Sequence, residues 1–424
     1  MCILFGFSAK ADRSEQDSLI VSVITCQPGR EIYELCGHEA IRVRGIMNGV
    51  PMDSVWNYGI FDFAQPNFVY RFVKGETDYR VAGYPFSWFM PEYVEAGRGV
   101  TEQDLALSQN EAKKVLSLLR TNALPENRVY RYNYVRNNCA TKITDILDSA
   151  TDRRIIYPDS INYGTFRKEM RAYHKAYPWY QFGIDLALGV GLDRPIAGRE
   201  EMFVPVEMMR KTANAKFDDG CPLVLESRIL NEDSGQAVDP PTPWYCTPLA
   251  VSILFLFLSV VTAWVEIRKR SICRIIYSLW FGICGLAGCL VMFLVIVSEH
   301  EATAPNLLIL WLNPLQLLFA FTVWSSRLRW MNIALSWYNI ITMGCMLLVW
   351  PFQGQSANVA FFPLMGGTLV LAAAYAIVRT EKGNIYNNEK NRILGAGEYS
   401  RDKRGSTGSN TDRRRAKARG GNRG

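Results

Sequence analysis

Histidine is scarce in this chain, which contains three in 424 residues. They are His38, His174 and His300, so few candidates exist for a catalytic histidine. The part of the chain before the long apolar runs has no CxxC, HxxxH or HExxH spacing, which argues against a zinc site. It also has no Gly-rich phosphate loop and no GxSxG motif, which disfavours a nucleotide site and a serine hydrolase. The sequence therefore predicts neither a metal nor a cofactor.

Apolar runs are concentrated in one region, although the mean hydropathy of the whole chain is close to zero. Residues before about Pro243 have the mixed composition of a globular domain, and residues after Arg379 are strongly basic. Five apolar stretches approach the roughly 20 residues that cross a bilayer core. They span residues 248–265, 275–297, 307–324, 333–350 and 357–378. Asn313, Pro314 and Gln316 interrupt the third, where we expect a kink packed against neighbouring helices. An all-α domain of five transmembrane helices is predicted.

The charges of the loops predict the orientation of these helices. The first loop (268–274) and the third, with Arg327 and Arg329, are basic, whereas the second (298–301) is acidic. Basic loops face the cytoplasm, and an odd number of spans places the N-terminal domain on the other side. The tail carries much of the net charge of +7 and has a composition typical of disorder. We interpret it as a topology signal near anionic lipids, not as a nucleic-acid site.

Five segments follow from these patterns. Residues 1–11 end in Ala9-Lys10-Ala11, which has the small-x-small form of a signal-peptidase site, so they are interpreted as a signal-peptide remnant. Residues 12–230 form the extracytoplasmic domain, and residues 231–246 are a linker. The transmembrane domain spans residues 247–378, and a disordered cytoplasmic tail spans residues 379–424.

Within the extracytoplasmic domain the pattern predicts an α+β fold. Strands are expected at residues 18–26, 39–45, 54–63 and 128–136, and helices at 102–121 and 140–147. Ser108 and Glu111 form a capping-box pattern inside the first helix. The pattern weakens between residues 155 and 230, where the core is expected to include Trp179, Phe182, Leu186 and Leu188.

Cys139 is the strongest candidate for a nucleophile. It follows two asparagines, which are good capping residues, and lies in the first turn of a predicted helix. The backbone N–H groups and helix dipole there can lower a thiol pKa from about 8.5 by roughly one unit or more. The same N–H groups can stabilise an oxyanion. His38, at the start of a predicted strand, is the candidate base of a Cys–His dyad.

A structural role for these residues stays open at this point. Five cysteines precede the apolar region after the leader, and in an oxidising compartment Cys139 could be a buried structural cysteine or half of a disulfide. Because five is odd, at least one of them stays free or pairs with another chain. These cysteines are Cys26, Cys36, Cys139, Cys221 and Cys246.

Several motifs together resemble one family, the lipoprotein N-acyltransferases of Bacteroidota. They are Gly37-His38-Glu39-Ala40, the run WNYGIFDF from Trp56 to Phe63, Asn67-Phe68, Phe72-Val73-Lys74-Gly75 and Asn137-Asn138-Cys139-Ala140-Thr141. The five apolar stretches behind them are similar to the second module of that family. The resemblance covers roughly residues 18–380. The order of histidine and cysteine is also similar to circularly permuted papain-like folds of the NlpC/P60 type.

This resemblance implies a function and a site. Cys139 corresponds to the nucleophile and His38 to the base. The third, orienting residue falls on Asn57, with Asp62 as the alternative. The implied enzyme is an inner-membrane acyltransferase that uses a phospholipid acyl donor and diacylated lipoproteins as acceptors. Two other functions stay open: a membrane-tethered cysteine amidase or peptidase acting on cell-wall peptide, and a non-enzymatic membrane sensor.

Overall fold

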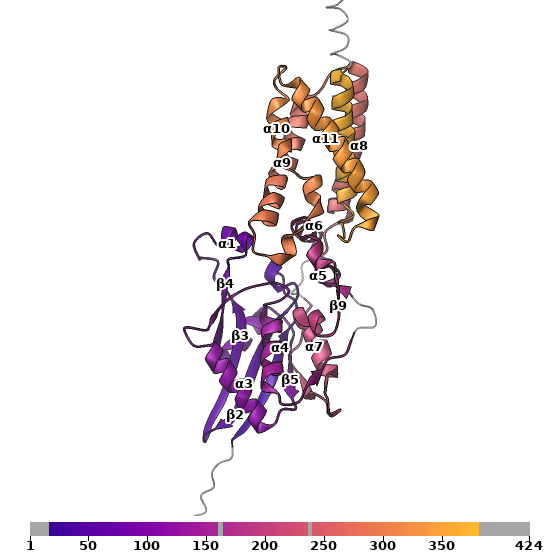
Figure 1. Cartoon of the computed structure of the whole chain (residues 1–424). Helices are drawn as coiled ribbons and strands as arrows, with labels where there is room; N and C mark the ends of the chain where they lie inside the picture. The colour runs from indigo at the N-terminus through magenta and orange to yellow at the C-terminus, as the bar shows by residue number, and fades with distance from the viewer. Residues whose placement is uncertain (1–16, 160–163, 236–239, 381–424) are drawn as a thin grey trace, which may run out of the picture. The chain divides into compact units, whose positions relative to one another are not determined.

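A computed structural model describes residues 17–159, 164–235 and 240–380 (Figure 1). The chain divides into two compact units. The first contains the residues up to Val251 together with Leu290–Ile309 and Trp350–Ala360, and the second contains Ser252–Cys289, Leu310–Val349 and the residues from Phe361 onward. The predicted signal-peptide remnant and nearly all of the predicted disordered tail lie outside the described residues.

A seven-stranded sheet forms the centre of the first unit, and its neighbouring strands are all antiparallel. The strands lie in the order β11-β5-β1-β2-β3-β4-β6. Their bounds are Ser18–Cys26 (β1), His38–Met47 (β2), Val50–Ile60 (β3), Asp78–Pro85 (β4), Val100–Leu105 (β5), Val129–Arg131 (β6) and Val224–Asn231 (β11). The alternating side chains of β1 and β2 are buried on both faces, so this sheet is covered on each side.

Helices cover the two faces of this sheet. The helices on these faces are α2 (Phe86–Glu95), α3 (Gln109–Asn122), α4 (Cys139–Ala150) and α7 (Pro205–Asn214), and the unit also contains α1 (Phe68–Lys74), α5 (Phe166–Tyr173) and α6 (Pro178–Ala187). The largest core cluster joins Val21, Val23, Ile41 and Val43 of the sheet to α3, α4 and α7. A smaller cluster joins the opposite face to Phe86, Phe89 and Tyr93 of α2. Short elements complete the unit: η1 (Ile32–Glu34), η2 (Val190–Leu192), η3 (Gly198–Phe203), η4 (Trp244–Cys246), η5 (Glu301–Thr303), β7 (Ile155–Ile156), β8 (Gly164–Thr165), β9 (Pro195–Ile196) and β10 (Lys216–Phe217).

The first three predicted strands are confirmed, but the predicted helix at 102–121 is wrong at its start. Residues 102–105 belong to β5, and the helix begins after Ser108, which forms the expected capping box with Glu111. Glu102 and Asp104 are buried in this strand, where both are paired with Arg44 of β2, two strands away, and with Arg228 of the adjacent β11. Such pairing across a sheet has no signature in local sequence. The strand predicted at 128–136 is shorter than expected, because only residues 129–131 pair with β4.

The expected core positions of α6 are also partly wrong. Trp179 is 48% exposed, whereas Gln181 and Asp185 are the buried residues of this helix. Asp185 is buried because it pairs with Arg167, at 3.1 Å between Oδ1 and Nη1. Arg167 also lies 2.9 Å from Asp193 and is itself fully buried. A buried ionic network therefore replaces the apolar face that the pattern predicted.

Four helices in the described residues are long and apolar enough to cross a membrane. They are α8 (Pro248–Lys269), α9 (Arg274–Ile296), α11 (Arg329–Val349, extended to Phe352 by η7, Trp350–Phe352) and a last helix at Phe361–Thr380. The predicted third span instead consists of η6 (Leu307–Leu310) and α10 (Leu315–Thr322), so the count of five is not confirmed. As expected, the polar groups at this break are packed: Gln316 is buried and donates to Asn339 Oδ1 of α11 at 3.1 Å.

Candidate active site

Cys139 is the first residue of α4, and its position is fixed by Asn138. The Asn138 side chain accepts a hydrogen bond from the Thr141 N–H, while the Thr141 hydroxyl accepts one from the Asn138 N–H. The buried Asn138 amide also donates to the carbonyls of Tyr134, at 2.8 Å, and Phe203, at 2.7 Å. This reciprocal capping box sets the first turn, so the thiol lies beside backbone N–H groups that have no partner inside the helix.

His38 is the first residue of β2, and the chain reaches it through a tight turn at Gly37. Gly37 has φ +81°, and a Cβ atom there would lie 2.6 Å from the Cys26 carbonyl oxygen, so only glycine fits. The His38 Nε2 atom lies 2.6 Å from Asn57 Oδ1, and the Asn57 amide donates to the Tyr84 hydroxyl at 2.9 Å. With its amide oriented in this way, Asn57 accepts the proton of Nε2 and leaves Nδ1 as the acceptor of the ring.

Asp62, the alternative orienting residue, has a different role in the structure. Its Oδ1 atom accepts a hydrogen bond from the Ala64 N–H at 2.8 Å and so stabilises a local turn. Of the two candidates that the sequence left open, Asn57 is therefore the one that contacts the imidazole.

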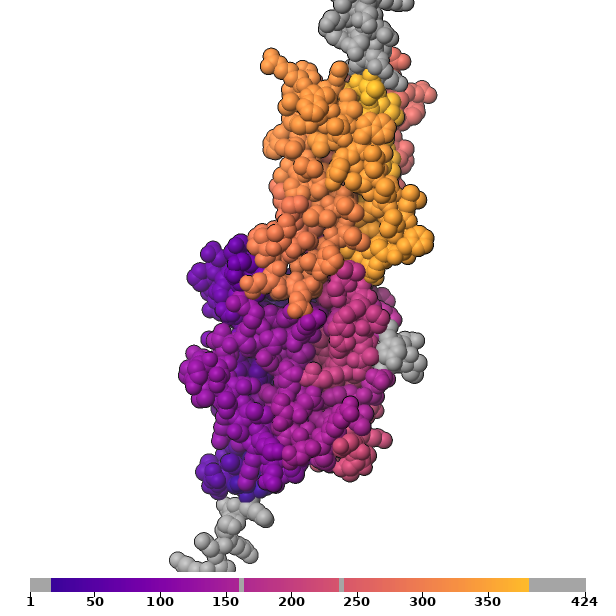
Figure 2. Space-filling model, in the orientation of Figure 1, coloured from indigo at the N-terminus to yellow at the C-terminus, as the bar shows by residue number. Residues whose placement is uncertain are grey.

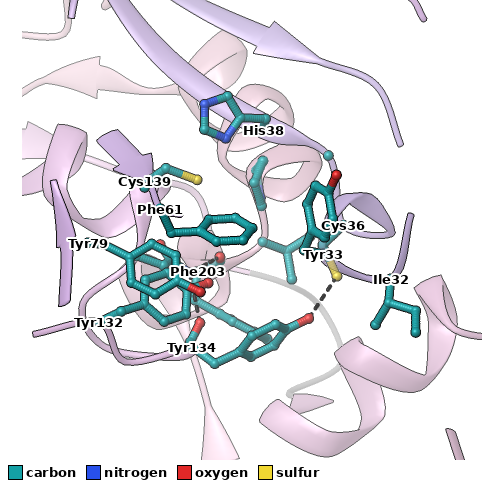
Figure 3. A pocket seen from close by; sticks show the side chains of 15 residues that line it. Ile32, Tyr33, Cys36, His38, Phe61, Tyr79, Tyr132, Tyr134, Cys139 and Phe203 are labelled. Carbon is teal, nitrogen blue, oxygen red and sulfur yellow. Dashed lines mark hydrogen bonds between the residues drawn. The ribbon is translucent and has the colours of Figure 1, made fainter. Parts of the chain in front are cut away.

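The fold brings Cys139 and His38 to the same small pocket (Figure 3). A Cβ atom on Gly59, in β3, would lie 3.9 Å from both Cys139 Cβ and His38 Cε1. The backbone N–H of Glu39, the residue after His38, also donates toward the Cys139 thiol. Gly59 has φ +88° and lies where the register between β3 and β4 shifts. This irregularity gives the thiol and the imidazole a common space, although they come from positions about a hundred residues apart.

Six aromatic side chains line this pocket, whose volume is about 100 Å³. Figure 3 shows the Cys139 sulfur pointing into it, on the side where the His38 ring lies. The aromatic lining consists of Tyr33, Phe61, Tyr79, Tyr132, Tyr134 and Phe203. Sequence reasoning missed these residues as a group, although the run of tyrosines at 130–134 and the IFDF segment were visible. Their separation in sequence hides the fact that they meet.

Burial controls the ionisation of both groups. It raises the pKa of the Cys139 thiol above its ordinary value, although the N–H groups of Glu39, Ala140 and Cys139 itself act to lower it. The prediction of a lowered thiol pKa is therefore wrong, because the apolar pocket outweighs the helix terminus. Burial likewise lowers the pKa of His38, against the opposing effect of its hydrogen bond to Asn57. At neutral pH the pair thus consists of a neutral thiol and a neutral imidazole.

Glu39 is a further polar residue close to Cys139 and His38, and the sequence alone did not identify it as a candidate. It is fully buried, and its Oε1 atom accepts a hydrogen bond from the Thr25 hydroxyl at 2.7 Å. Its Oε2 atom has no hydrogen-bond partner among the described residues. Burial raises the pKa of this carboxyl group well above its ordinary value, which favours the protonated form of Glu39. The sequence signal was available, since Glu39 follows His38 on a strand whose other inward residues are apolar.

The remaining histidines and cysteines lie elsewhere or are not bonded to Cys139. His174 is buried against Gln181, at 2.9 Å, and His300 contacts the Phe72 carbonyl at 2.9 Å. Within the described residues every cysteine is free, and none of them forms a disulfide with Cys139. Cys36 lines the same pocket, where burial raises its pKa to about 11 and its sulfur lies 3.1 Å from the Tyr134 hydroxyl.

A sheet-rich domain with this cysteine–histidine pocket, joined to membrane-spanning helices, defines a multi-pass membrane protein with a site outside the membrane-spanning segments. Two family models match the chain: residues 8–168 match the Lnb N-terminal periplasmic domain, and residues 241–383 match the Lnb transmembrane domain. The chain belongs to the Lnb family, and it is an inner-membrane protein of lipoprotein modification with a periplasmic domain. No curated protein and no solved structure matches it.

Proposed function

We propose that this protein is a lipoprotein N-acyltransferase. It moves an acyl chain from a membrane phospholipid, through a thioester on Cys139, to the α-amino group of a diacylglyceryl-cysteine. One observation carries the proposal: Cys139 and the Asn57-bound His38 line the same aromatic pocket in a domain of the Lnb family. Cys139 is the nucleophile, His38 the general acid and base, and Asn57 the residue that orients the imidazole.

In the first half-reaction His38 Nδ1 takes the proton of the Cys139 thiol as the sulfur attacks the ester carbonyl carbon of the phospholipid. The carbonyl oxygen becomes an oxyanion, for which the N–H groups at the start of α4 are suitable donors. When the tetrahedral intermediate collapses, the C–O bond of the ester breaks. The imidazolium returns its proton to the departing alkoxide, and a lysophospholipid leaves an acylated Cys139 behind.

In the second half-reaction the neutral α-amino group of the acceptor attacks the thioester carbonyl carbon. His38 takes a proton from the attacking nitrogen, the C–S bond breaks, and the proton passes to the released sulfur. The products are an amide and the free enzyme, so the two steps balance. The aromatic lining of the pocket favours the amine over water, because it excludes solvent from the thioester.

The topology supports a circularly permuted papain-like interpretation of the domain. The helix that begins with Cys139 packs on β2 and β3 of an antiparallel sheet, and His38 begins one of these strands. His38 precedes Cys139 in the chain, which is the permuted order. Asn57 lies on the strand after the histidine strand, where such folds place the third residue.

The arrangement of segments is part of the same proposal. Residues 12–230 are the catalytic domain, residues 231–246 a linker and residues 247–378 the membrane domain, with η6 and α10 together as the third of five membrane elements. The basic loops and the tail face the cytoplasm. Residues 290–309, which include the end of α9 and the loop after it, and residues 350–360 belong to the same compact unit as the catalytic domain, which supports their placement on the periplasmic side.

Mass spectrometry of lipoprotein N-termini tests this function. Cells that lack the protein are complemented with the wild type, Cys139→Ala or His38→Ala. We expect the amide-linked acyl chain to disappear in the deletion strain and to return only with the wild type. Triacylated lipoproteins in cells that carry only Cys139→Ala would contradict the proposal, provided that both forms reach the same level in the membrane.

A further inference from the structure

Helix α1 presents an unusually apolar surface for the outside of a folded domain. Val69 is 73% exposed and Phe72 is 44% exposed, and Tyr70 beside them is also exposed. The charged residues of the helix are already paired, Arg71 with Asp78 and Lys74 with Glu76. Figure 2 shows the segment around α1, in indigo, as a protrusion from the first unit. An apolar surface of this kind indicates a lipid or protein contact.

The loop that follows α9 holds the C-terminal end of α1. The Glu299 N–H donates to the Lys74 carbonyl at 2.8 Å, and the Ser298 hydroxyl donates to the Val73 carbonyl at 2.9 Å. His300 Nε2 lies 2.9 Å from the Phe72 carbonyl. The last carbonyls of α1, which a helix leaves unpaired, are thus satisfied by three consecutive residues of this loop.

These contacts attach α1 to the end of an apolar helix. All three loop residues lie within four positions of Ile296, where α9 ends, and α9 is long and apolar enough to span a membrane. The Tyr70 ring also lies 6.0 Å from the ring of Phe293, in the last turn of α9. A helix attached to the end of a membrane span is at the level of the lipid headgroups, where its exposed apolar side chains meet acyl chains.

A series of aromatic rings connects α1 to the pocket of Cys139. The rings of Phe72 and Phe68 are 6.2 Å apart, those of Phe68 and Phe63 are 5.0 Å apart, and those of Phe63 and Phe61 are 4.8 Å apart. Tyr33 packs on Phe61 at 5.3 Å. We call Tyr33, Phe61, Phe63, Phe68 and Phe72 the aromatic track. Its inner members, Tyr33 and Phe61, line the pocket that contains Cys139 and His38.

We propose that the aromatic track and the exposed face of α1 bind one acyl chain of a membrane phospholipid and guide its ester toward the Cys139 thiol. The inference rests on the proposed function and names the route of the donor. The track fits an acyl chain because its side chains are aromatic, contiguous and, at Phe63, 62% exposed. The track side chains themselves are apolar apart from the Tyr33 hydroxyl, whereas the charged groups of Glu34, Glu92 and Arg98 line a pocket beside Tyr33, Phe61 and Phe63, where a polar headgroup could lie.

The test compares two donors on the full-length protein in mixed micelles. The variant is Phe63→Ser with Phe72→Ser. The matched control is Leu225→Ser with Ile229→Ser, which removes two exposed apolar side chains from β11, at an edge of the sheet. Acylation of Cys139 is followed by intact-protein mass spectrometry with dioleoyl-phosphatidylethanolamine and with the short, soluble ester p-nitrophenyl butyrate.

The track variant should lose about tenfold more rate with the phospholipid than with the short ester, because only the long chain uses the track. The control should react with both donors as the wild type does. Equal losses with both donors, or no loss with the phospholipid, would overturn the inference and leave the proposed function intact. A wild-type protein that is acylated by neither donor would instead refute the proposed function.

Crosslinking gives a second, independent measurement. The Cys139→Ala protein, which cannot consume the donor, is irradiated with a phosphatidylethanolamine that carries a diazirine in one acyl chain. Labelling of peptides that cover residues 61–75 supports the track. Labelling confined to the membrane-spanning helices would exclude it.

Discussion

Asn57 holds the imidazole of His38 through a 2.6 Å hydrogen bond to Nε2, and Tyr84 fixes the amide that makes this bond. The relationship determines which ring nitrogen stays available for the thiol. Replacing Asn57 with Ala should therefore lower the rate of Cys139 acylation by roughly 10- to 100-fold, because the ring loses its orientation and preferred tautomer. The measurement is acylation of Cys139 by a short soluble ester.

Asp62→Ala is the matched control for this variant, because Asp62 was the other candidate for the orienting residue. Its carboxylate stabilises a turn at Ala64, so we expect activity within a factor of about two of the wild type. A larger loss in Asp62→Ala than in Asn57→Ala would reverse the assignment.

Gly59→Ala should abolish most of the acylation activity. The added methyl group would lie 3.9 Å from both Cys139 Cβ and His38 Cε1, and would occupy the space that the reacting ester needs. Gly220→Ala is a suitable control, because Gly220 has φ +87° and no atom within 4 Å of its added Cβ. Both variants should lose a similar stability of about 1–2 kcal/mol from the left-handed backbone. If the two variants lose equal activity, backbone strain and not obstruction is the cause.

The pH dependence of acylation should follow the ionisation of His38. The imidazole acts as a base only when it is neutral. Burial lowers the pKa of His38, so the ring stays neutral down to a lower pH than an ordinary histidine does. The acid limb of kcat/KM for the short ester should then lie below about pH 6.5. In Asn57→Ala this limb should move to still lower pH, because the lost hydrogen bond is the interaction that raises the pKa of His38. A limb above pH 7 in the wild type would contradict the neutral pair.

Local sequence was sufficient for those parts of the fold that depend on local chemistry. Strand β1 matches its predicted bounds because nine consecutive residues carry the β-branched pattern of a buried strand. The capping boxes at Ser108 and Asn138 follow from residues three positions apart. Cys139 could be proposed as a nucleophile because its cap and its helix are adjacent in sequence.

The features that could not be predicted from the sequence depend on contacts between residues that are distant in the chain. Helix α6 buries Gln181 and Asp185 because Arg167 and His174 of the preceding segment lie against them. The pKa of Cys139 could not be predicted from its helix terminus, because the aromatic side chains of the pocket come from five separate segments. The third membrane element is short because Pro314 begins a new helix at a position where composition alone suggests a continuous span.

The buried ionic network of α5 and α6 should be essential for stability. Arg167→Ala would leave Asp193 buried without its cation and Asp185 with Arg171 alone, at a cost of about 3–5 kcal/mol. Arg194→Ala removes an exposed partner of Glu200 and should change stability by less than about 1 kcal/mol. Thermal unfolding of both proteins in detergent measures the difference. Equal melting temperatures would show that the network contributes no more than a surface pair.

Glu39→Gln should remove a pH dependence of stability while preserving shape. The pKa of Glu39 in the folded protein lies well above its ordinary value, so folding favours the protonated acid. Its contribution to stability is complete below the pKa of the unfolded chain and declines as the pH rises toward the folded pKa. Glutamine cannot ionise, so the variant should unfold at a higher temperature than the wild type at pH 8 and at a similar temperature at pH 4. The exposed Glu226→Gln is the control and should differ little from the wild type at either pH. Equal destabilisation by Glu39→Gln at both pH values would contradict this prediction. It would mean that Glu39 stabilises the fold through its packing and hydrogen bond, independently of its protonation.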